Sequence, residues 1–438
     1  MLSILRYLAL FLFLTLLTPY ASQARTLRVG PDRNYKHIRD VALAATDGDV
    51  ILLDAGTYEA DVAHWSQNDL VVWAPNGRAR IEARGQNEAG KGIWVVEGRN
   101  FTAENIEFSG ARVPDRNGAG VRIHAKGKVT LRNCFFHDNE NGVLGDAEEI
   151  LIDRCIFNHN GAGDGQSHNI YVWGPKVTIQ SSYIHRSVVG HNVKTRGETN
   201  YILGNRIMDE ADGNGSYGID VPDCGRTYII GNVVEQGPES QNYHLISYGA
   251  ESGKNVAELY VVNNTLVNNG RADGFFLRIH KGTRGRITNN IFYGPGTTWV
   301  GGDLDEDHNV VIATRENEPG FANPRSYDYR LTADSPRWVI DRGARPGLSS
   351  TGYDLTPKLE YVYDANGRVR PVSGALDLGA FEYVAPPPPP AVTPAAKRVT
   401  MTKPAPVKAK ATPAKKKSKT YPAKTTKTTK TTTKTTTP

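Results

Sequence analysis

Charged residues that could bind an acidic group and move a proton stand close together near the middle of this 438-residue chain. Lys194 and Arg196 are two residues apart, and Asp220 and Asp223 follow about one sequence repeat later. A lysine beside a second cation gives up its proton more readily, which makes Lys194 a candidate general base. The alternative interpretation is an ion pair between Lys194 and Asp220, which at a surface stabilises a protein only weakly.

Alignment of the repeats places these residues on one strip of the surface. The inward position of each repeat is apolar: Val121, Val143, Ile170, Val193, Ile219, Ile246 and Leu277. Because side chains alternate along a strand, the residues one and three positions later face outward. These two rows, here called the outward strip, are Arg122, Leu144, Tyr171, Lys194, Asp220, Ser247 and Arg278, and His124, Asp146, Trp173, Arg196, Pro222, Gly249 and His280. A slip of one residue in this register would exchange inside and outside.

The register rests on a short phrase that recurs along the chain, an Asn or a polar substitute followed by alternating apolar residues. Its anchors are at 105, 133, 154, 182, 205, 232, 264 and 290, with spacings of 28, 21, 28, 23, 27, 32 and 26 residues. Such a period indicates a repeat architecture, because one unit cannot bury its own apolar face. Strand-like runs precede the anchors and no helical periodicity lies between them, so we expect short parallel strands stacked at about 4.8 Å per coil.

From about residue 26 to 384 the chain resembles the right-handed parallel β-helix family of pectate-lyase-like proteins. The recurring Asn is similar to the family's asparagine ladder, and 48–58 is similar to its first strand, after an amphipathic segment at 35–45. Asp328 to Leu331 and Asp377 to Glu382 resemble the closing segment of bacterial members. The resemblance implies an all-β fold, a single-stranded right-handed parallel β-helix solenoid with a short N-terminal capping helix. The composition after residue 385 adds a disordered C-terminal tail. The expected boundaries are 1–24 signal peptide, 25–58 cap and first strand, 59–300 β-helix, 301–385 C-terminal coils and cap, and 386–438 tail.

This fold hosts lyases, hydrolases, epimerases and adhesins, so function must come from the site. Lyases of the family neutralise a sugar carboxylate and remove the proton beside it. The outward strip offers Lys and Arg for carboxylates and aromatic faces for sugar rings. We therefore predict cleavage of an acidic (uronate) polysaccharide by β-elimination, with a glycoside hydrolase, a C5-epimerase or a non-catalytic polysaccharide-binding protein as alternatives. The epimerase motif Asp-Pro-His-Asp is absent, and no lyase motif matches residue by residue.

Roles on the strip follow from that prediction. Lys194 is the candidate base, Arg122 or Arg278 would hold the carboxylate, and Tyr171 or His280 would donate to the leaving oxygen. The predicted catalytic residues are Lys194, Arg196, Asp220, Arg278 and His280, and the predicted substrate-binding residues are Arg122, His124, Tyr171, Trp173, His191 and Asp223.

An acidic, glycine-rich stretch from 209 to 216 predicts a calcium site, since many lyases of this fold use Ca²⁺ to bridge enzyme and substrate. Its expected ligands are Asp209, Asp212 and Asp220. An ordinary acidic turn on a solvated surface is the alternative, and a hydrolase would be favoured if Asp212, Asp220 and Asp223 converged.

Histidines and cysteines also fall at repeating positions. His168, His191 and His244, with Tyr217 among them, lie two residues before the inward position. They are either acid–base groups at the rim of the strip or hydrogen-bonded core residues, and the second interpretation is favoured. No His or Cys spacing fits a tetrahedral zinc site. Cys134 and Cys155 should stack on successive coils, either as a disulfide or as two buried thiols, and Cys224 is left without a role.

The two ends of the chain differ from the middle. Residues 1–24 have one early charge, a short apolar run and small residues before Arg25, which predicts a bacterial signal peptide and a secreted or periplasmic protein, with a membrane anchor as the alternative. The tail holds 12 Lys, one Arg and no acidic residue, so the remaining body has 39 basic and 46 acidic side chains, a net charge near −7. We expect a monomer whose disordered tail either binds an anionic envelope polymer or nucleic acid, or is a solvated extension.

Overall fold

The computed structural model describes residues 24–251 and 255–386. The chain separates into one unit ending at Ala385 and a second from Pro386 onward. The predicted tail and residues 1–23 of the predicted signal peptide lie outside the described residues. Among the described residues, no helix is long and apolar enough to cross a membrane.

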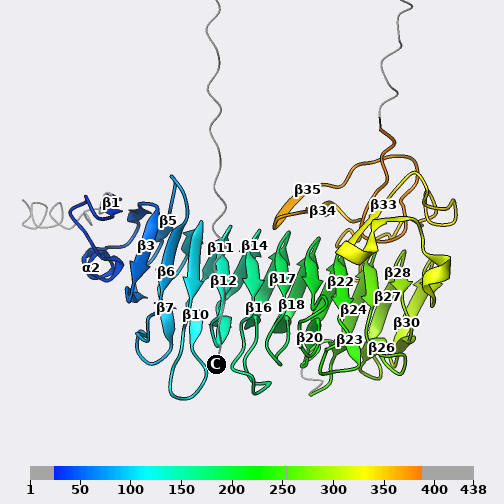
Figure 1. Ribbon diagram of the computed structural model, residues 1–438, viewed down its shortest axis with the longest axis horizontal. Helices are drawn as coiled ribbons and strands as arrows, with labels where there is room; N and C mark the ends of the chain where they lie inside the picture. Colours follow the sequence, from blue (N-terminus) through cyan, green and yellow to red (C-terminus); the bar gives the residue numbers. More distant parts are fainter. Residues whose placement is uncertain (1–23, 252–254, 387–438) are drawn as a thin grey trace, which may run out of the picture. The chain divides into compact units, whose positions relative to one another are not determined.

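The first unit is a stack of coils in which three strands recur (Figure 1). The first column of strands is β4 Ala63–Trp65, β7 Gly92–Val96, β10 Ala119–His124, β13 Asn141–Asp146, the start of β16 Ile170–Gln180 and of β18 Val193–Leu203, β20 Ile219–Val221, β23 His244–Tyr248, β26 Phe275–Ile279 and β29 Thr297–Val300. The second column is β1 Thr26–Val29, β2 Val50–Leu53, β5 Val71–Trp73, β8 Phe101–Glu104, β11 Lys128–Arg132, β14 Glu149–Asp153, the ends of β16 and β18, β21 Arg226–Ile230, β24 Glu258–Val262, β27 Arg284–Thr288 and β30 Asp303–Asp307.

The third column forms a separate sheet. Its strands are β3 Gly56–Glu59, β6 Ala79–Glu82, β9 Ile106–Ser109, β12 Phe135–His137, β15 Ile156–Asn158, β17 Tyr183–His185, β19 Arg206–Met208, β22 Val233–Gln236, β25 Thr265–Asn268, β28 Ile291–Tyr293 and β31 Val310–Ile312. After them come η1 Arg315–Asn317, β32 Phe321–Asn323, η2 Pro324–Ser326, β33 Asp328–Leu331, β34 Leu359–Val362 and β35 Asn366–Val369. All ladders within the columns are parallel, which confirms the predicted solenoid of short strands.

The predicted register of the first column is confirmed. The ladder joins Val121, Val143, Ile170, Val193, Ile219, Ile246 and Leu277 in that order, and all seven side chains are buried. The core also contains stacked rings, with the ring centres of Phe108 and Phe136 5.1 Å apart and those of Phe136 and Phe157 4.7 Å apart. Because each coil repeats the inward pattern of the one before, apolar burial continues along the stack.

The predicted asparagine ladder is present in the later coils. Asn205, Asn232, Asn264, Asn290 and Asn309 are stacked, and the Nδ2 of each of the first four donates to the Oδ1 of the next at 2.9–3.0 Å. Each Oδ1 also accepts a backbone N–H from the preceding coil. For example, the N–H of Asn232 donates to Oδ1 of Asn264 at 2.9 Å. The ladder therefore satisfies buried backbone groups at the bend between the second and third columns.

The first three predicted anchors are wrong by one residue. Asn105, Asn133 and Arg154 have φ values of 60°, 49° and 54°, in the left-handed region, and do not point into the ladder. The ladder position there belongs to the following residue, so Cys134 and Cys155 come before Ser182 and Asn205. The N–H of Cys134 approaches Sγ of Cys155 at 3.4 Å, and both cysteines are buried free thiols. Of the two alternatives for this pair, the structure has the thiols.

The N-terminal end of the core is covered by the predicted helix, α2 Ile38–Ala44, which buries Ile38, Val41 and Ala42. The carboxylate of Asp61 accepts the N–H groups of Ile38 and Arg39 at 2.7 and 3.0 Å. A side chain from the next coil thus satisfies the free donors of the first helical turn.

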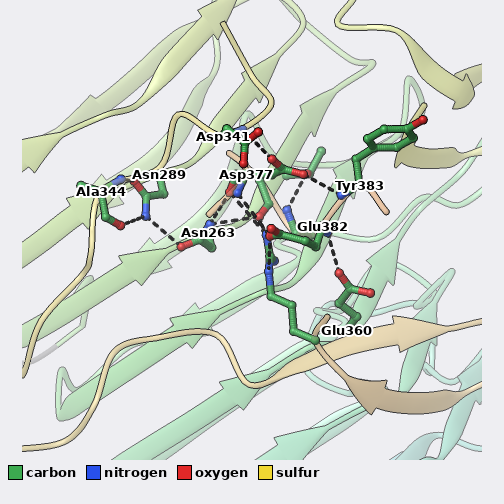
Figure 2. A network of polar contacts seen from close by, with 12 residues as sticks. Asn263, Asn289, Asp341, Ala344, Glu360, Asp377, Glu382 and Tyr383 are labelled. Carbon is green, nitrogen blue, oxygen red and sulfur yellow. Dashed lines mark hydrogen bonds and ion pairs between the residues drawn. The ribbon is translucent and has the colours of Figure 1, made fainter. Parts of the chain in front are cut away.

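The predicted closing segment packs along the third column. Leu378, Ala380 and Phe381 join a cluster with buried residues of β19, β22, β25 and β28. Figure 2 shows the polar contacts at this place, where Asn263 donates to the carbonyl of Asp377 at 2.8 Å. Arg370 pairs there with Glu382 at 3.1 Å. The same C-terminal region packs closely on Gly204. A Cβ on residue 204 would lie 3.1 Å from Cβ of Leu359, and the φ of Gly204 is +57°, so both the contact and the backbone favour glycine at that bend.

Replacement of Asn264 by alanine should lower the midpoint of urea unfolding. Its amide bonds both neighbouring coils, and each buried group left unpaired costs about 1–3 kcal/mol. We expect a loss of about 3 kcal/mol, against a change within about 0.5 kcal/mol for the exposed Asn317→Ala control. Equal midpoints for the two variants would contradict a stabilising ladder.

Candidate functional site

The parallel ladder brings the middle of the outward strip together. Tyr171, Lys194 and Asp220 are directly paired on β16, β18 and β20, and Trp173 is paired with Arg196. Neighbouring strands are about 4.8 Å apart, so side chains from three coils converge on one patch. This patch, here called the central cluster, consists of Tyr171, Trp173, His191, Lys194, Arg196, Asp220, Asp223 and Glu251.

Lys194 lies among carboxylates. Its Nζ is 3.5 Å from Oδ2 of Asp220 and 3.1 Å from Oε1 of Glu251, and it lies 5.3 Å from the centre of the Tyr171 ring. The direct neighbours of the Lys194 ammonium are thus carboxylates, with Arg196 joined to it through Glu251. The ion-pair alternative describes the geometry, because two carboxylates contact the ammonium directly.

Arg196 spans three partners. Its Nε donates to the Tyr171 hydroxyl at 2.8 Å, Nη1 is 2.8 Å from Oδ1 of Asp223, and Nη2 contacts Oε2 of Glu251. Burial alone would lower the pKa of Arg196, but its hydrogen bonds to Glu251 and Asp223 outweigh that effect and raise it. Glu251 thus bridges Lys194 and Arg196 with its two carboxylate oxygens.

Asp220 is the most buried carboxylate of the central cluster, with only 4% of its side chain exposed. Burial raises its pKa to about 6, against the opposing effect of the Lys194 ammonium. A carboxylate with such a pKa can accept or release a proton close to neutral pH.

The predicted histidine row is a stack beside this cluster. The ring centres of His168 and His191 are 4.6 Å apart, and Nδ1 of His168 accepts the N–H of His191 at 2.9 Å. Nδ1 of His191 in turn accepts the N–H of Tyr217 at 3.2 Å, and burial lowers the pKa of His191 to about 3. The hydrogen-bonded alternative is confirmed for these two rings. His191 also reaches the cluster, since its Nε2 is 3.6 Å from Oδ2 of Asp220.

A cavity of about 380 Å³ opens next to the cluster. Tyr171, Trp173, Arg196, Glu198, Asp223 and Asn255 line it. Its size falls within the range of small-molecule sites, and its wall combines aromatic rings with charged groups. Such a surface can stack a sugar ring and hold a carboxylate.

The ends of the outward strip lie apart from the central cluster. Arg122 donates from Nε to Nε2 of His124 at 3.1 Å, and the buried Leu144 lies between Arg122 and Tyr171 in the ladder. At the other end, Ser247 separates Arg278 from Asp220, and His280 is exposed. The strip is therefore continuous in the ladder, but the buried Leu144 and Ser247 interrupt it at the surface, and only its middle is a compact site.

The three predicted calcium ligands do not converge. Asp209 is buried and accepts from Asn192 at 3.0 Å, Asp212 pairs with Arg186 at 3.0 Å, and Asp220 belongs to the central cluster. In the part of the chain that the structure describes, no group of three His, Cys, Asp or Glu could hold a metal ion. These residues do not fit calcium as a set. The convergence of Asp212, Asp220 and Asp223 that would favour a hydrolase is likewise not found.

Comparisons with known proteins agree with this architecture. Residues 62–207 match the family described as a right-handed β-helix region. The crystal structure of pectate lyase Pel9A aligns with a TM-score of 0.57 and 16% identity over 82% of this chain and 97% of that one. The fold is the right-handed parallel β-helix.

Two further solved structures align with this β-helix less well. Pectin methylesterase PemA from Erwinia chrysanthemi gives a TM-score of 0.36 and 12% identity over 51% of this chain and 81% of that one. ORF18 of Geobacillus virus E2 gives 0.38 and 12% over 61% and 54%. None of the curated proteins compared matches the chain. The fold rests on the alignment with pectate lyase Pel9A, and at 16% identity the site must supply the activity.

Glu251 and Glu198 were missed by the sequence analysis. Glu251 follows β23 of the β-helix and reaches back across the coils to residues 55 and 57 positions earlier. Nothing in the repeat spacing places a loop residue over a particular strand. Glu198 could have been found from the sequence, because it follows Arg196 by two residues in the long strand β18.

The pKa of Asp220 predicts a pH-dependent difference between the wild type and Asp220→Asn. The folded-state pKa of about 6 exceeds the usual value near 4, so the folded state binds more protons between them and ionisation destabilises it. Relative to the variant, the wild type should lose about 3 kcal/mol of unfolding free energy between pH 4 and pH 7. Urea titrations of both proteins across this range measure it, and a constant difference would contradict the assigned pKa.

Proposed function

We propose that this β-helix protein binds an acidic polysaccharide along the outward strip and cleaves it by β-elimination at the central cluster. The observation that carries the proposal is the Glu251 carboxylate, which contacts the Lys194 ammonium with one oxygen and the Arg196 guanidinium with the other. Two cations arranged around one carboxylate form a recognition site for such a group. Tyr171 and Trp173 border the same site with aromatic faces suited to sugar rings.

A uronate carboxylate can take the place of Glu251. The Glu251 side chain is 49% exposed, whereas Asp220 and Asp223 are 4% and 15% exposed and would keep their contacts with the two cations. Departure of Glu251 would free one contact of Lys194 and one of Arg196, and Arg196 lines the cavity of about 380 Å³. The substrate would then regain the two contacts that Glu251 gives up.

The chemistry follows from that placement. Contact with two cations withdraws charge from the uronate carboxylate and acidifies the adjacent C–H. Asp220, ionised above a pKa of about 6, would take this proton, while the C–H electrons form a carbon–carbon double bond and the neighbouring glycosidic C–O bond breaks. The Tyr171 hydroxyl accepts from Arg196 and so keeps its own proton for the leaving oxygen. Lys194 is the alternative base.

A non-catalytic polysaccharide-binding protein is the second candidate. It is favoured by the ion pairs of the cluster, since Lys194 and Arg196 are already matched by Asp220, Asp223 and Glu251. In this case the strip holds the polymer and no bond breaks. We further propose that residues 1–24 direct export and that the basic tail binds an anionic envelope polymer, which would bring the strip close to such polymers.

Turnover is tested by ultraviolet absorbance on a panel of uronate polymers, with and without calcium. We expect absorbance from unsaturated uronate on one polymer, and a loss of about 100-fold or more in Arg196→Ala and in Asp220→Asn, since each removes a group acting in the transition state. Lys194→Ala tells whether lysine or aspartate is the base. Lys176→Ala, an exposed lysine paired with Glu149 on the second column, is the matched control and should retain full activity.

If no polymer gives a rise in absorbance but the protein still binds one of them, the lyase proposal is wrong and the non-catalytic binding protein takes its place. Full activity in all three cluster variants would contradict the site itself.

Replacement of Glu251 by glutamine should strengthen substrate binding. The substrate carboxylate competes with Glu251 for the same two cations, so removal of its charge should lower KM by about three- to tenfold. Glu148→Gln, an exposed position, is the control and should leave KM unchanged. An unchanged or raised KM in Glu251→Gln would show that the two carboxylates do not share one site.

A further inference from the structure

A second, larger cavity of about 710 Å³ lies between the third column and the C-terminal region. Its floor includes residues of β17 and β19, and its other wall comes from residues 323–330 and from the hairpin of β34 and β35. Figure 1 shows this hairpin beside the coils that carry β17. No residue lines both this cavity and the one at the central cluster.

Arg206 is the unusual residue of this cavity. Its guanidinium lies 5.1 Å from the ring centre of Tyr183 and 5.8 Å from that of Tyr363, and Nη1 donates to the Tyr327 carbonyl at 2.8 Å. Its buried Nε has no hydrogen-bond partner among the described residues. A buried donor without a partner carries a desolvation penalty that a ligand oxygen would remove.

The other arginines of this cavity are matched by carboxylates. Arg186 pairs with Glu210 at 2.6 Å, Arg330 with Asp328 at 2.6 Å, and Arg368 with Glu360 at 2.7 Å. Arg206 has no carboxylate within ion-pair distance in the ranges 24–251 and 255–386. Three of the four lining arginines are thus matched, and Arg206 is the one whose charge no carboxylate of the described residues offsets directly. The cavity therefore favours an anion.

Aromatic rings surround the unmatched cation. Tyr183 stacks on His185 with ring centres 4.0 Å apart, and its hydroxyl contacts Oε1 of Glu210. His185 is 8% exposed, and its Nδ1 also lacks a hydrogen-bond partner among the described residues. Tyr363 lines the cavity and is 71% exposed. Rings beside polar groups that lack partners suit an occupant with both apolar faces and hydrogen-bonding groups, as a sugar has.

We infer that this cavity is a second binding site, which takes an acidic sugar with its carboxylate on Arg206 and its ring against Tyr363. The volume of about 710 Å³ accommodates more than one sugar unit. The site is separate from the proposed cleavage site because it lies on the third column, and the central cluster lies on the first. It would bind polymer or product without acting on it.

The test is isothermal titration calorimetry with trigalacturonate on the purified full chain in raised salt, where binding to the basic tail is screened. All variants keep the tail, so its contribution is common to them. In the Lys194→Ala, Arg196→Ala background, which removes the central cluster, we expect one remaining site per chain. Adding Arg206→Gln should weaken it at least tenfold, and adding Tyr363→Ala should weaken it about three- to tenfold.

Arg80→Gln in the same background is the matched control, since Arg80 is an exposed arginine on β6 that pairs with Glu107. It should leave binding unchanged. Should Arg206→Gln fail to fold, Tyr363→Ala decides, because the exposed ring contributes little to stability. No remaining site in the background protein, or a site indifferent to both substitutions, would overturn the inference. Failure of the proposed cleavage would show instead as absent turnover in the wild type with this binding intact.

Discussion

Parallel pairing between successive coils is the constraint on which the rest of this structure depends. Each coil must place an apolar side chain above that of the coil before it, from Val121 to Leu277, or the core opens to water. The same pairing puts the neighbouring outward residues in a row about 4.8 Å apart. A site assembled from three coils, with Tyr171, Lys194 and Asp220 in line, follows from core packing without any element dedicated to the site.

Buried amides make this pairing specific. Between the second and third columns the chain bends, and backbone groups there would be unpaired without the ladder of Asn205, Asn232, Asn264 and Asn290. A shift of the strand pairing by one residue would misplace every ladder amide at once and turn the outward residues inward. The ladder therefore stabilises the register, and the register in turn positions the charged groups of the central cluster.

Much of the fold could be predicted because it repeats. Val193 and Lys194 are placed by the period alone, and so is the stacking of Cys134 and Cys155 on successive coils. The capping helix at Ile38 was indicated instead by the amphipathic segment at 35–45. The anchors at 105, 133 and 154 were wrong because a left-handed Asn or Arg one residue earlier imitates the ladder residue. The electrostatics of the cluster could not be predicted. The repeat placed Asp220 beside Lys194, but Glu251 lies on a loop, and loop residues obey no period, so the second carboxylate could not be predicted from the sequence.

The central claim is that Lys194 and Arg196 form a carboxylate site which Glu251 fills in the absence of substrate. A crystal structure of the Asp220→Asn protein with a bound uronate oligosaccharide tests it most directly. The account predicts a sugar carboxylate bridging Lys194 Nζ and the Arg196 guanidinium, a ring against Tyr171 or Trp173, and Glu251 turned away. An oligosaccharide bound elsewhere on the coils, with Glu251 still bridging the two cations, would contradict it.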